Sequence, residues 1–273
     1  MPDSHFGSTV LDDTGARGAN GVSKPAVVMV HGLGGTSNTF EPVMPAVESY
    51  RVIRPDLPGA GRSALKPSIN SIDGLAKSLI EALNSIQINR VILVAHSMGT
   101  LVAQHMALSG RILIDGMVLF GALTEPPEAA KEALLKRASL AQTDGMAGIA
   151  AQVANAALSG KTLKENPSTH AFVRESLMRQ SASGYSSHCR ILAKSKAYPV
   201  SDITIPVHLI TGSDDVVAPV SMAEKLNTEI PDSNLEVLQG TGHWPTLEAP
   251  GECQRALTDA LNAFATPNTI ERN

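Results

Sequence analysis

Three residues of the sequence could together turn a serine into a nucleophile: Ser97, Asp215 and His243. A serine hydroxyl reacts poorly until a histidine takes its proton and a carboxylate orients that histidine. Ser97 stands in the pattern Ala95-His-Ser-Met-Gly99, between an apolar run and a helical segment. A turn this tight, from a strand into a helix, strains the serine and exposes its hydroxyl above the sheet. The order serine, acid, histidine also suits this chemistry on an α/β sheet.

The acid and the histidine each come directly after a predicted strand. Asp215 follows the apolar run Val207–Ile210, and His243 follows Leu235–Leu238 in a glycine-flanked loop. In open α/β sheets, the loops at the carboxyl ends of the strands carry the groups that contact ligands. We therefore expect His243 to serve as the base for Ser97 and Asp215 to orient it.

Two other carboxylates compete with Asp215 for this role. Asp214 is adjacent, and either member of the pair could instead form the turn. Glu125 follows the predicted strand Gly116–Phe120, and an acid at the end of that strand could also reach the base. The position of Asp215 between its strand and Pro219 favours Asp215.

Attack on a carbonyl also requires two fixed N–H donors for the oxyanion that forms. One should be the main-chain N–H of Met98, directly after the serine, and the other that of Leu33, in the loop after the first apolar strand. His31 lies in the same loop and is expected to brace it. His96 is expected to be a neighbour of the site, because a side chain next to Ser97 in the turn points away from it.

The elements that must carry these residues alternate between strand and helix over most of the chain. The strands are continuous apolar runs, which is typical of sheets covered on both faces. The pattern predicts an α/β fold with a doubly wound, mostly parallel sheet. The predicted elements are an edge strand at Phe6–Leu11, a loop at 12–24, strands at 26–30, 51–54, 91–95, 116–120, 207–210 and 235–238, and helices at 39–47, 72–83, 101–108, 220–228 and 251–264.

The alternation stops between residues 123 and 199. Four helices are predicted there, at 128–140, 146–158, 168–180 and 184–195, with no strand among them. We predict a single domain, 1–273, with its core at about 1–122 and 200–273 and an inserted helical cap at 123–199. The cap should roof the pocket and set its selectivity, although helix-face residues of this kind also form cores. The candidate lining residues are Met146, Phe172, Met178, Tyr185 and His188.

Composition narrows the classes of partner. The net charge is −4, and no basic stripe is present, so we expect no nucleic acid. The two cysteines lie in no metal-binding pattern, so we expect a reduced compartment and no metal site. The beginning of the chain shows no secretory signal, and no apolar run is long enough to span a bilayer, so a cytoplasmic protein is predicted. The sequence does not decide whether the protein forms a homodimer.

Two other function classes compete with nucleophilic catalysis. Gly32-Leu-Gly-Gly-Thr-Ser37 lies close to a dinucleotide-binding pattern, with Asp56 near the end of the next strand, as an oxidoreductase would require. Ser37, however, replaces the third glycine, and that interpretation leaves the residues around Ser97 unexplained. A non-catalytic small-molecule receptor on the same scaffold is the second alternative, but nothing in the sequence favours a loss of catalysis.

The assembled motifs resemble those of the α/β-hydrolase superfamily over about 26–122 and 200–265. They are His31-Gly-Leu-Gly-Gly35, Asp56-Leu-Pro-Gly-Ala-Gly-Arg-Ser63, Ala95-His-Ser-Met-Gly99, Gly212-Ser-Asp-Asp-Val-Val-Ala-Pro219 and Gly242-His243. Within it, Gly184-Tyr-Ser-Ser-His-Cys189 is similar to the last cap helix of the 3-oxoadipate enol-lactonase group and related esterases. That group commonly has glycine where Ala95 and Thr100 stand, which leaves the substrate open.

The resemblance implies an α/β-hydrolase fold and a serine hydrolase that cleaves a carboxylic ester or lactone through an acyl-enzyme on Ser97. No metal or organic cofactor is then needed, and the expected partner is a small-molecule ester or lactone. Because aromatic residues make up only 3% of the chain, a small aliphatic acyl group or lactone is favoured over a flat aromatic substrate. A serine at 97 also argues against epoxide hydrolases and haloalkane dehalogenases, which use an aspartate there.

Overall fold

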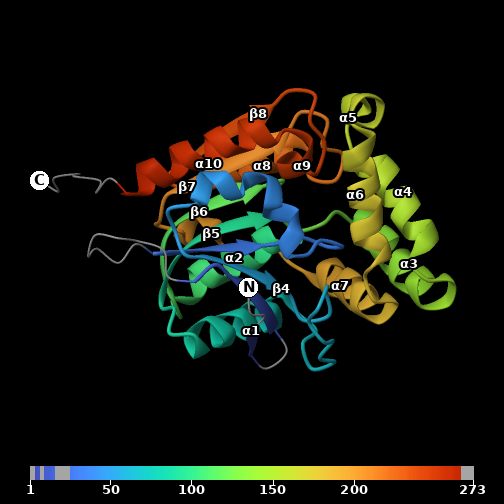
Figure 1. Cartoon of the computed structure of the whole chain (residues 1–273), viewed down its shortest axis with the longest axis horizontal. Coiled ribbons are helices and arrows are strands. Elements are labelled where there is room, and N and C mark those ends of the chain that lie inside the picture. The colour runs from blue at the N-terminus through green and yellow to red at the C-terminus, as the bar shows by residue number, and fades with distance from the viewer. Residues whose placement is uncertain (1–3, 7–8, 16–24, 266–273) are drawn as a thin grey trace, which may run out of the picture.

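Figure 1 shows the computed structural model of the chain, which describes residues 4–6, 9–15 and 25–265. Within these residues, eight strands form one sheet in the order β1-β2-β4-β3-β5-β6-β7-β8. β1 and β2 form an antiparallel edge, and the six strands from β3 to β8 run parallel. The strands are β1 (Ser4–Phe6), β2 (Thr9–Asp13), β3 (Ala26–Val30), β4 (Val52–Asp56), β5 (Arg90–His96), β6 (Leu113–Phe120), β7 (Val207–Gly212) and β8 (Ser233–Leu238). The predicted α/β-hydrolase fold, with its doubly wound and mostly parallel sheet, is confirmed.

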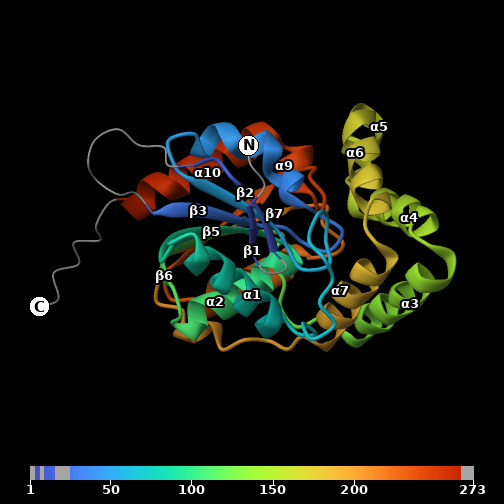
Figure 2. The same ribbon diagram turned by 60° about the horizontal axis from the view of Figure 1, so that its bottom comes forward.

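Helices cover both faces of this sheet, which explains why its central strands are apolar throughout (Figure 2). Successive side chains of a strand point to opposite faces. Val28 and Val30 of β3 belong to one core, and Val27 and Met29 to the other. The first core includes α1 (Ile72–Ser85), α2 (Met98–Ser109) and α8 (Val220–Glu229), and the second includes η1 (Ser37–Val47) and α10 (Pro250–Ala265).

Between β6 and β7 the described chain forms five α-helices, one short 3-10 helix and no strand. The five α-helices lie together at one end of the sheet in both views (Figures 1 and 2). The helices are α3 (Glu128–Asp144), α4 (Ala147–Ala157), α5 (Gly160–Glu165), α6 (Pro167–Met178) and α7 (Ala182–Lys194). The short 3-10 helix η2 (Val200–Asp202) then leads into β7, and α9 (Pro245–Glu248) follows β8. No helix among the described residues is long and apolar enough to cross a membrane.

The first part of the chain differs from prediction. The single edge strand expected at Phe6–Leu11 is wrong: β1 and β2 pair with each other, Phe6 opposite Thr9, and β2 then pairs antiparallel with β4. Asp12 and Asp13 extend β2 instead of starting a loop. Residues 14 and 15 are in neither a helix nor a strand, and residues 16–24 of the predicted loop lie outside the described residues. The helix expected at 39–47 forms as the 3-10 helix η1, in which Pro42 and Pro45 provide no N–H donor.

Candidate active site

The structure brings Ser97, His243 and Asp215 together in one hydrogen-bonded array. The Oγ of Ser97 lies 2.9 Å from Nε2 of His243, and Nδ1 of His243 lies 2.8 Å from Oδ2 of Asp215. All three residues are buried, each with 5% of its surface exposed. Since a carboxylate can only accept, His243 donates from Nδ1 to Asp215, which leaves the Nε2 lone pair for the hydroxyl proton of Ser97. This arrangement can deprotonate a serine.

Ser97 sits in the strained turn that the sequence predicts. It separates β5 from α2 with φ 52° and ψ −122°, a left-handed φ that non-glycine residues seldom adopt. Two glycines make room for this turn. A Cβ on Gly32 would lie 2.7 Å from the Cβ of Ser97, and one on Gly99 would lie 2.2 Å from the main-chain oxygen of Val30. Larger residues at 32 or 99 would therefore push the serine out of place.

Asp215 is held as an ionised acceptor. Its second oxygen, Oδ1, accepts from the main-chain N–H groups of Val217 and Ala218, both at 2.8 Å. Burial raises the pKa of Asp215, but the charge of His243 and these hydrogen bonds outweigh burial, so the pKa lies below its usual value. The carboxylate is thus suited to orient His243 and to stabilise its protonated form.

Neither rival carboxylate takes this position. Asp214 is exposed and accepts from the hydroxyl of Ser213 at 2.8 Å. Glu125 pairs with Lys131 and Lys196, each at 2.8 Å, and hydrogen bonds from these lysines lower the pKa of Glu125 to about 2. Of the three candidate acids, Asp215 is the one in contact with His243.

The two other histidines near the site make contacts with the main chain. His31 is fully buried; its Nε2 accepts from the N–H of Leu57 at 3.0 Å, so Nδ1 carries the proton and donates to the oxygen of Gly32 at 2.8 Å. It braces its loop, as predicted. Burial lowers the pKa of His96 to about 3, and its Nε2 donates to the main-chain oxygen of His243 at 2.6 Å. His96 is therefore a neutral support of the histidine loop.

The two expected oxyanion donors lie in segments next to Ser97. Met98 is the first residue of α2, and the first N–H groups of a helix have no partner within it. Leu33 follows Gly32, the residue that approaches Ser97, in the loop from β3 to η1. Both positions are compatible with the expected role, which stays a prediction.

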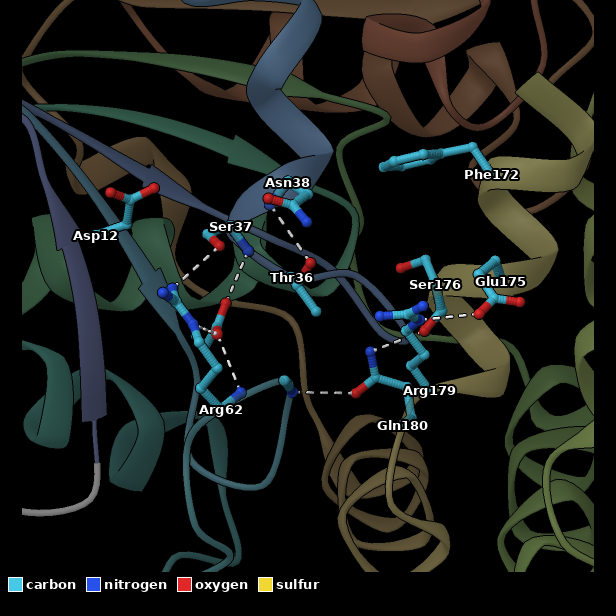
Figure 3. A pocket seen from close by; sticks show the side chains of 12 residues that line it. Asp12, Thr36, Ser37, Asn38, Arg62, Phe172, Glu175, Ser176, Arg179 and Gln180 are labelled. Carbon is cyan, nitrogen blue, oxygen red and sulfur yellow. Dashed lines mark hydrogen bonds and ion pairs between the residues drawn. The ribbon is translucent and has the colours of Figure 1, made fainter. Parts of the chain in front are cut away.

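Two side chains of the inserted segment, one on α6 and one in the connection from α6 to α7, donate hydrogen bonds to this loop. The hydroxyl of Ser176 and the amide of Gln180 donate to the main-chain oxygen of Gly34, at 3.0 and 3.3 Å. Gln180 also donates to the oxygen of Gly35 at 3.3 Å. It accepts from the N–H of Gly61 at 3.4 Å (Figure 3). The loop that carries Leu33 is thus held by residues far from it in the sequence.

The residues expected to line the pocket differ in exposure: Met146 is buried, whereas Met178 is 37% exposed. Tyr185 and His188 are buried, and His188 donates from Nε2 to the oxygen of Pro58 at 2.8 Å. Phe172 is 39% exposed and projects from α6 over a cavity of about 590 Å³ (Figure 3). Ser97 and His243 are absent from the lining of that cavity, which consists of Asp12, Thr36, Ser37, Asn38, Asp56, Gly61, Arg62, Phe172, Glu175, Ser176, Arg179 and Gln180.

The side chains that would bind a metal or a ribose are arranged as follows in the described part of the chain. Among the described residues, no group of three or more His, Cys, Asp or Glu side chains is arranged to hold a metal ion. Asp56, which a dinucleotide fold would use for a ribose, instead accepts from the N–H of Ser37 at 2.8 Å and from Nε of Arg62 at 2.7 Å. Asp56 thereby links the start of η1 to the loop that follows β4.

A comparison with protein families agrees with the sheet order and the serine turn. The family model described as the alpha/beta hydrolase fold matches residues 25–250. The chain belongs to the α/β-hydrolase family. Family membership accounts for the serine turn after β5 and for the loops after β7 and β8, which carry an acid and a histidine in hydrolases of this fold.

Relatives within the family include lactone-cleaving enzymes. The chain is 27% identical over 269 residues to 3-oxoadipate enol-lactonase 2 of Acinetobacter baylyi, covering 97% of this chain and 100% of that protein. Its fold matches the enol-lactonase from Burkholderia xenovorans with a TM-score of 0.86 at 22% identity, covering 96% and 100%. A thermophilic esterase from Thermogutta terrifontis also gives a TM-score of 0.86 at 22% identity, covering 94% of each chain. The protein is a hydrolase of this family and resembles its enol-lactonases.

Some residues that shape the site carry no local signal in the sequence. A Cβ on Gly121 would lie 3.3 Å from Oδ2 of Asp215 and from Nδ1 of His243, so the acid and base pack against bare backbone there. The hydrogen bond from His96 to His243 joins residues 147 positions apart. Neither contact could be predicted, because each depends on how separate loops meet in three dimensions.

Proposed function

We propose that the protein hydrolyses a carboxylic ester or a lactone through an acyl-enzyme on Ser97. The observation that carries the proposal is the continuous array from Ser97 to His243 to Asp215, with contacts of 2.9 and 2.8 Å. The relationship to an enol-lactonase over almost the whole chain supports the same class of substrate.

In this mechanism, His243 takes the hydroxyl proton of Ser97 as Oγ attacks the substrate carbonyl carbon. The N–H groups of Leu33 and Met98 would hold the oxyanion. When the intermediate collapses, His243 gives its proton to the leaving oxygen, which departs as an alcohol or, from a lactone, stays tethered to the acyl group. His243 then activates a water molecule, which attacks the ester on Ser97 and releases the acid. Asp215 holds the required tautomer of His243 throughout.

The helical segment completes the proposed arrangement. We propose that residues 123–199 act as a cap on a core of about 1–122 and 200–273. This proposal is supported by the hydrogen bonds that Ser176 and Gln180 donate to the loop carrying Leu33. The cap would determine which acyl groups reach Ser97.

The test is hydrolysis of p-nitrophenyl esters of increasing acyl length and of several lactones, with Ser97→Ala in parallel. We expect the wild-type protein to hydrolyse members of one class and the folded variant to lose on the order of 10³–10⁶ in rate. Hydrolysis by Ser97→Ala at the wild-type rate would contradict the proposal, as would a wild-type protein that hydrolyses neither class.

A further inference from the structure

One carboxylate outside the array ties the histidine loop to the inserted helices. Glu248, the last residue of α9, accepts four hydrogen bonds. Oε1 accepts from the N–H of Trp244 at 3.0 Å, and Oε2 accepts from the N–H of Gly242 at 3.0 Å. Oε2 also accepts from the N–H of Ser159 and the hydroxyl of Thr162, both at 2.9 Å. Two of its donors flank His243, and the other two belong to α5 and its N-cap.

The main chain of His243 depends on the same neighbourhood. The N–H of His243 donates to the oxygen of Ala157, the last residue of α4, at 2.8 Å. Three successive N–H groups, at residues 242, 243 and 244, are therefore held either by Glu248 or by the inserted segment. The contact is close enough to require glycine at 242, because a Cβ there would lie 2.6 Å from the nitrogen of Ser159.

We propose that Glu248 is a positioning residue that holds the loop carrying His243 against the turn between α4 and α5. The inference rests on the proposed function, because it concerns how the base of that reaction is placed. A carboxylate suits this role because, once ionised, it has about four acceptor sites and no donor, and it faces four donors here. Loss of Glu248 would leave these donors without their acceptor and free His243 to move relative to Ser97. Misplacement of a reacting group by about 1 Å can cost on the order of 10²-fold in rate.

The experiment measures how fast Ser97 reacts with a fluorophosphonate, which requires the base but no particular substrate. The full-length wild-type protein is compared with Glu248→Ala, Glu248→Gln, Thr162→Val and the double variant Glu248→Ala/Thr162→Val. Glu252→Gln is the matched control, because Glu252 is an exposed carboxylate in the first turn of the next helix. Both the rate constant and the fraction of molecules that react at completion are recorded.

A positioning role predicts that Glu248→Ala lowers the rate constant by on the order of 10²-fold while most molecules still react. Glu248→Gln should lower the rate constant less than Glu248→Ala. The amide nitrogen of the glutamine can take the side of Trp244, which has one donor, and the amide oxygen can still accept from the other three donors. Thr162→Val should lower the rate constant a few-fold in the wild-type background. The double variant should react at the same rate as Glu248→Ala alone, because the two residues act through one contact. Glu252→Gln should match the wild type.

A purely structural role would reduce the fraction of molecules that react and leave the rate constant of the remainder within twofold of wild type. That result overturns the inference, as does an effect of Thr162→Val that adds fully to that of Glu248→Ala. If Glu248→Ala does not fold, the rate constants of Glu248→Gln and Thr162→Val decide the question in the same way. A wild-type protein that does not react at all contradicts the proposed function itself, which separates the two failures.

Discussion

His96 donates a 2.6 Å hydrogen bond from Nε2 to the main-chain oxygen of His243. The residue before the proposed nucleophile thus supports the residue that would deprotonate it. Their rings are also close, with centroids 5.0 Å apart. Because burial lowers the pKa of His96 to about 3, the ring stays neutral at ordinary pH and keeps a single proton for this bond.

The first prediction concerns the stability of a variant that lacks the His96 donor. His96→Phe keeps a ring of similar size but leaves the buried oxygen of His243 without its donor. Such a loss costs about 1–3 kcal/mol in the free energy of unfolding. His96→Gln, whose amide can donate from a similar position, should recover more than half of the loss. Chemical denaturation of the three proteins checks this, and a His96→Phe variant as stable as the wild type would show that the bond contributes nothing.

The second prediction concerns the acid. In Asp215→Asn, the amide oxygen can still accept from the N–H groups of Val217 and Ala218, which turns the NH₂ toward His243. His243 would then accept at Nδ1 and carry its proton on Nε2, the wrong tautomer for Ser97. We expect kcat to fall by on the order of 10⁴-fold, as the same exchange does in other serine hydrolases.

The control for this prediction is Glu125→Gln. That change weakens the pairs with Lys131 and Lys196, which do not involve the array, so kcat should stay within twofold of wild type. The reverse pattern, with Glu125→Gln inactive and Asp215→Asn active, would assign the acid to Glu125.

The third prediction is a pH dependence of stability that arises from His188. Burial lowers its pKa to about 4 from the ordinary 6.5. Well above pH 6.5 this residue is neutral in both the folded and the unfolded chain, and its contribution to stability is constant. As the pH falls from 6.5 to 4, the unfolded chain binds a proton that the folded chain does not, so the free energy of unfolding falls by about 3 kcal/mol on account of His188.

His188→Gln tests this linkage, because glutamine does not titrate yet can still donate to the oxygen of Pro58. Urea unfolding at intervals between pH 7 and pH 4 should show a shallower decline for the variant than for the wild type. Burial also lowers the pKa values of His31 and His96, so part of the fall in the free energy of unfolding should remain in both proteins. Parallel curves for the two proteins would contradict the prediction.

The sequence predicted those elements whose signal is local and repeated. The apolar face of α1 follows from the spacing of Ile72, Leu75 and Leu79, all of which are buried. The turn at Ser97 follows from an apolar strand and a helix that leave no room for a longer connection. By contrast, α5 and α9, with six and four residues, are too short to show a helical period.

Contacts between distant segments could not be predicted in this way. Nothing near residue 9 indicates that β2 pairs with β4, since the pairing places Val10 opposite Asp56, far along the chain. Two of the four hydrogen bonds that Glu248 accepts likewise come from Thr162 and Ser159, which lie 86 and 89 positions away in the sequence. Sequence patterns predicted Ser97, Asp215 and His243 as site residues because each follows a recognisable strand. They did not predict the residues whose hydrogen bonds hold those loops in place.

The most direct test of the proposed mechanism is to find which residue becomes covalently modified. The wild-type protein and a folded Ser97→Ala variant are treated with a fluorophosphonate, digested, and mapped by mass spectrometry. The mechanism predicts a single adduct, on Ser97, in the wild type and none in the variant. An adduct on another residue of the wild-type protein, or equal labelling of Ser97→Ala, would contradict the claim that Ser97 is the nucleophile.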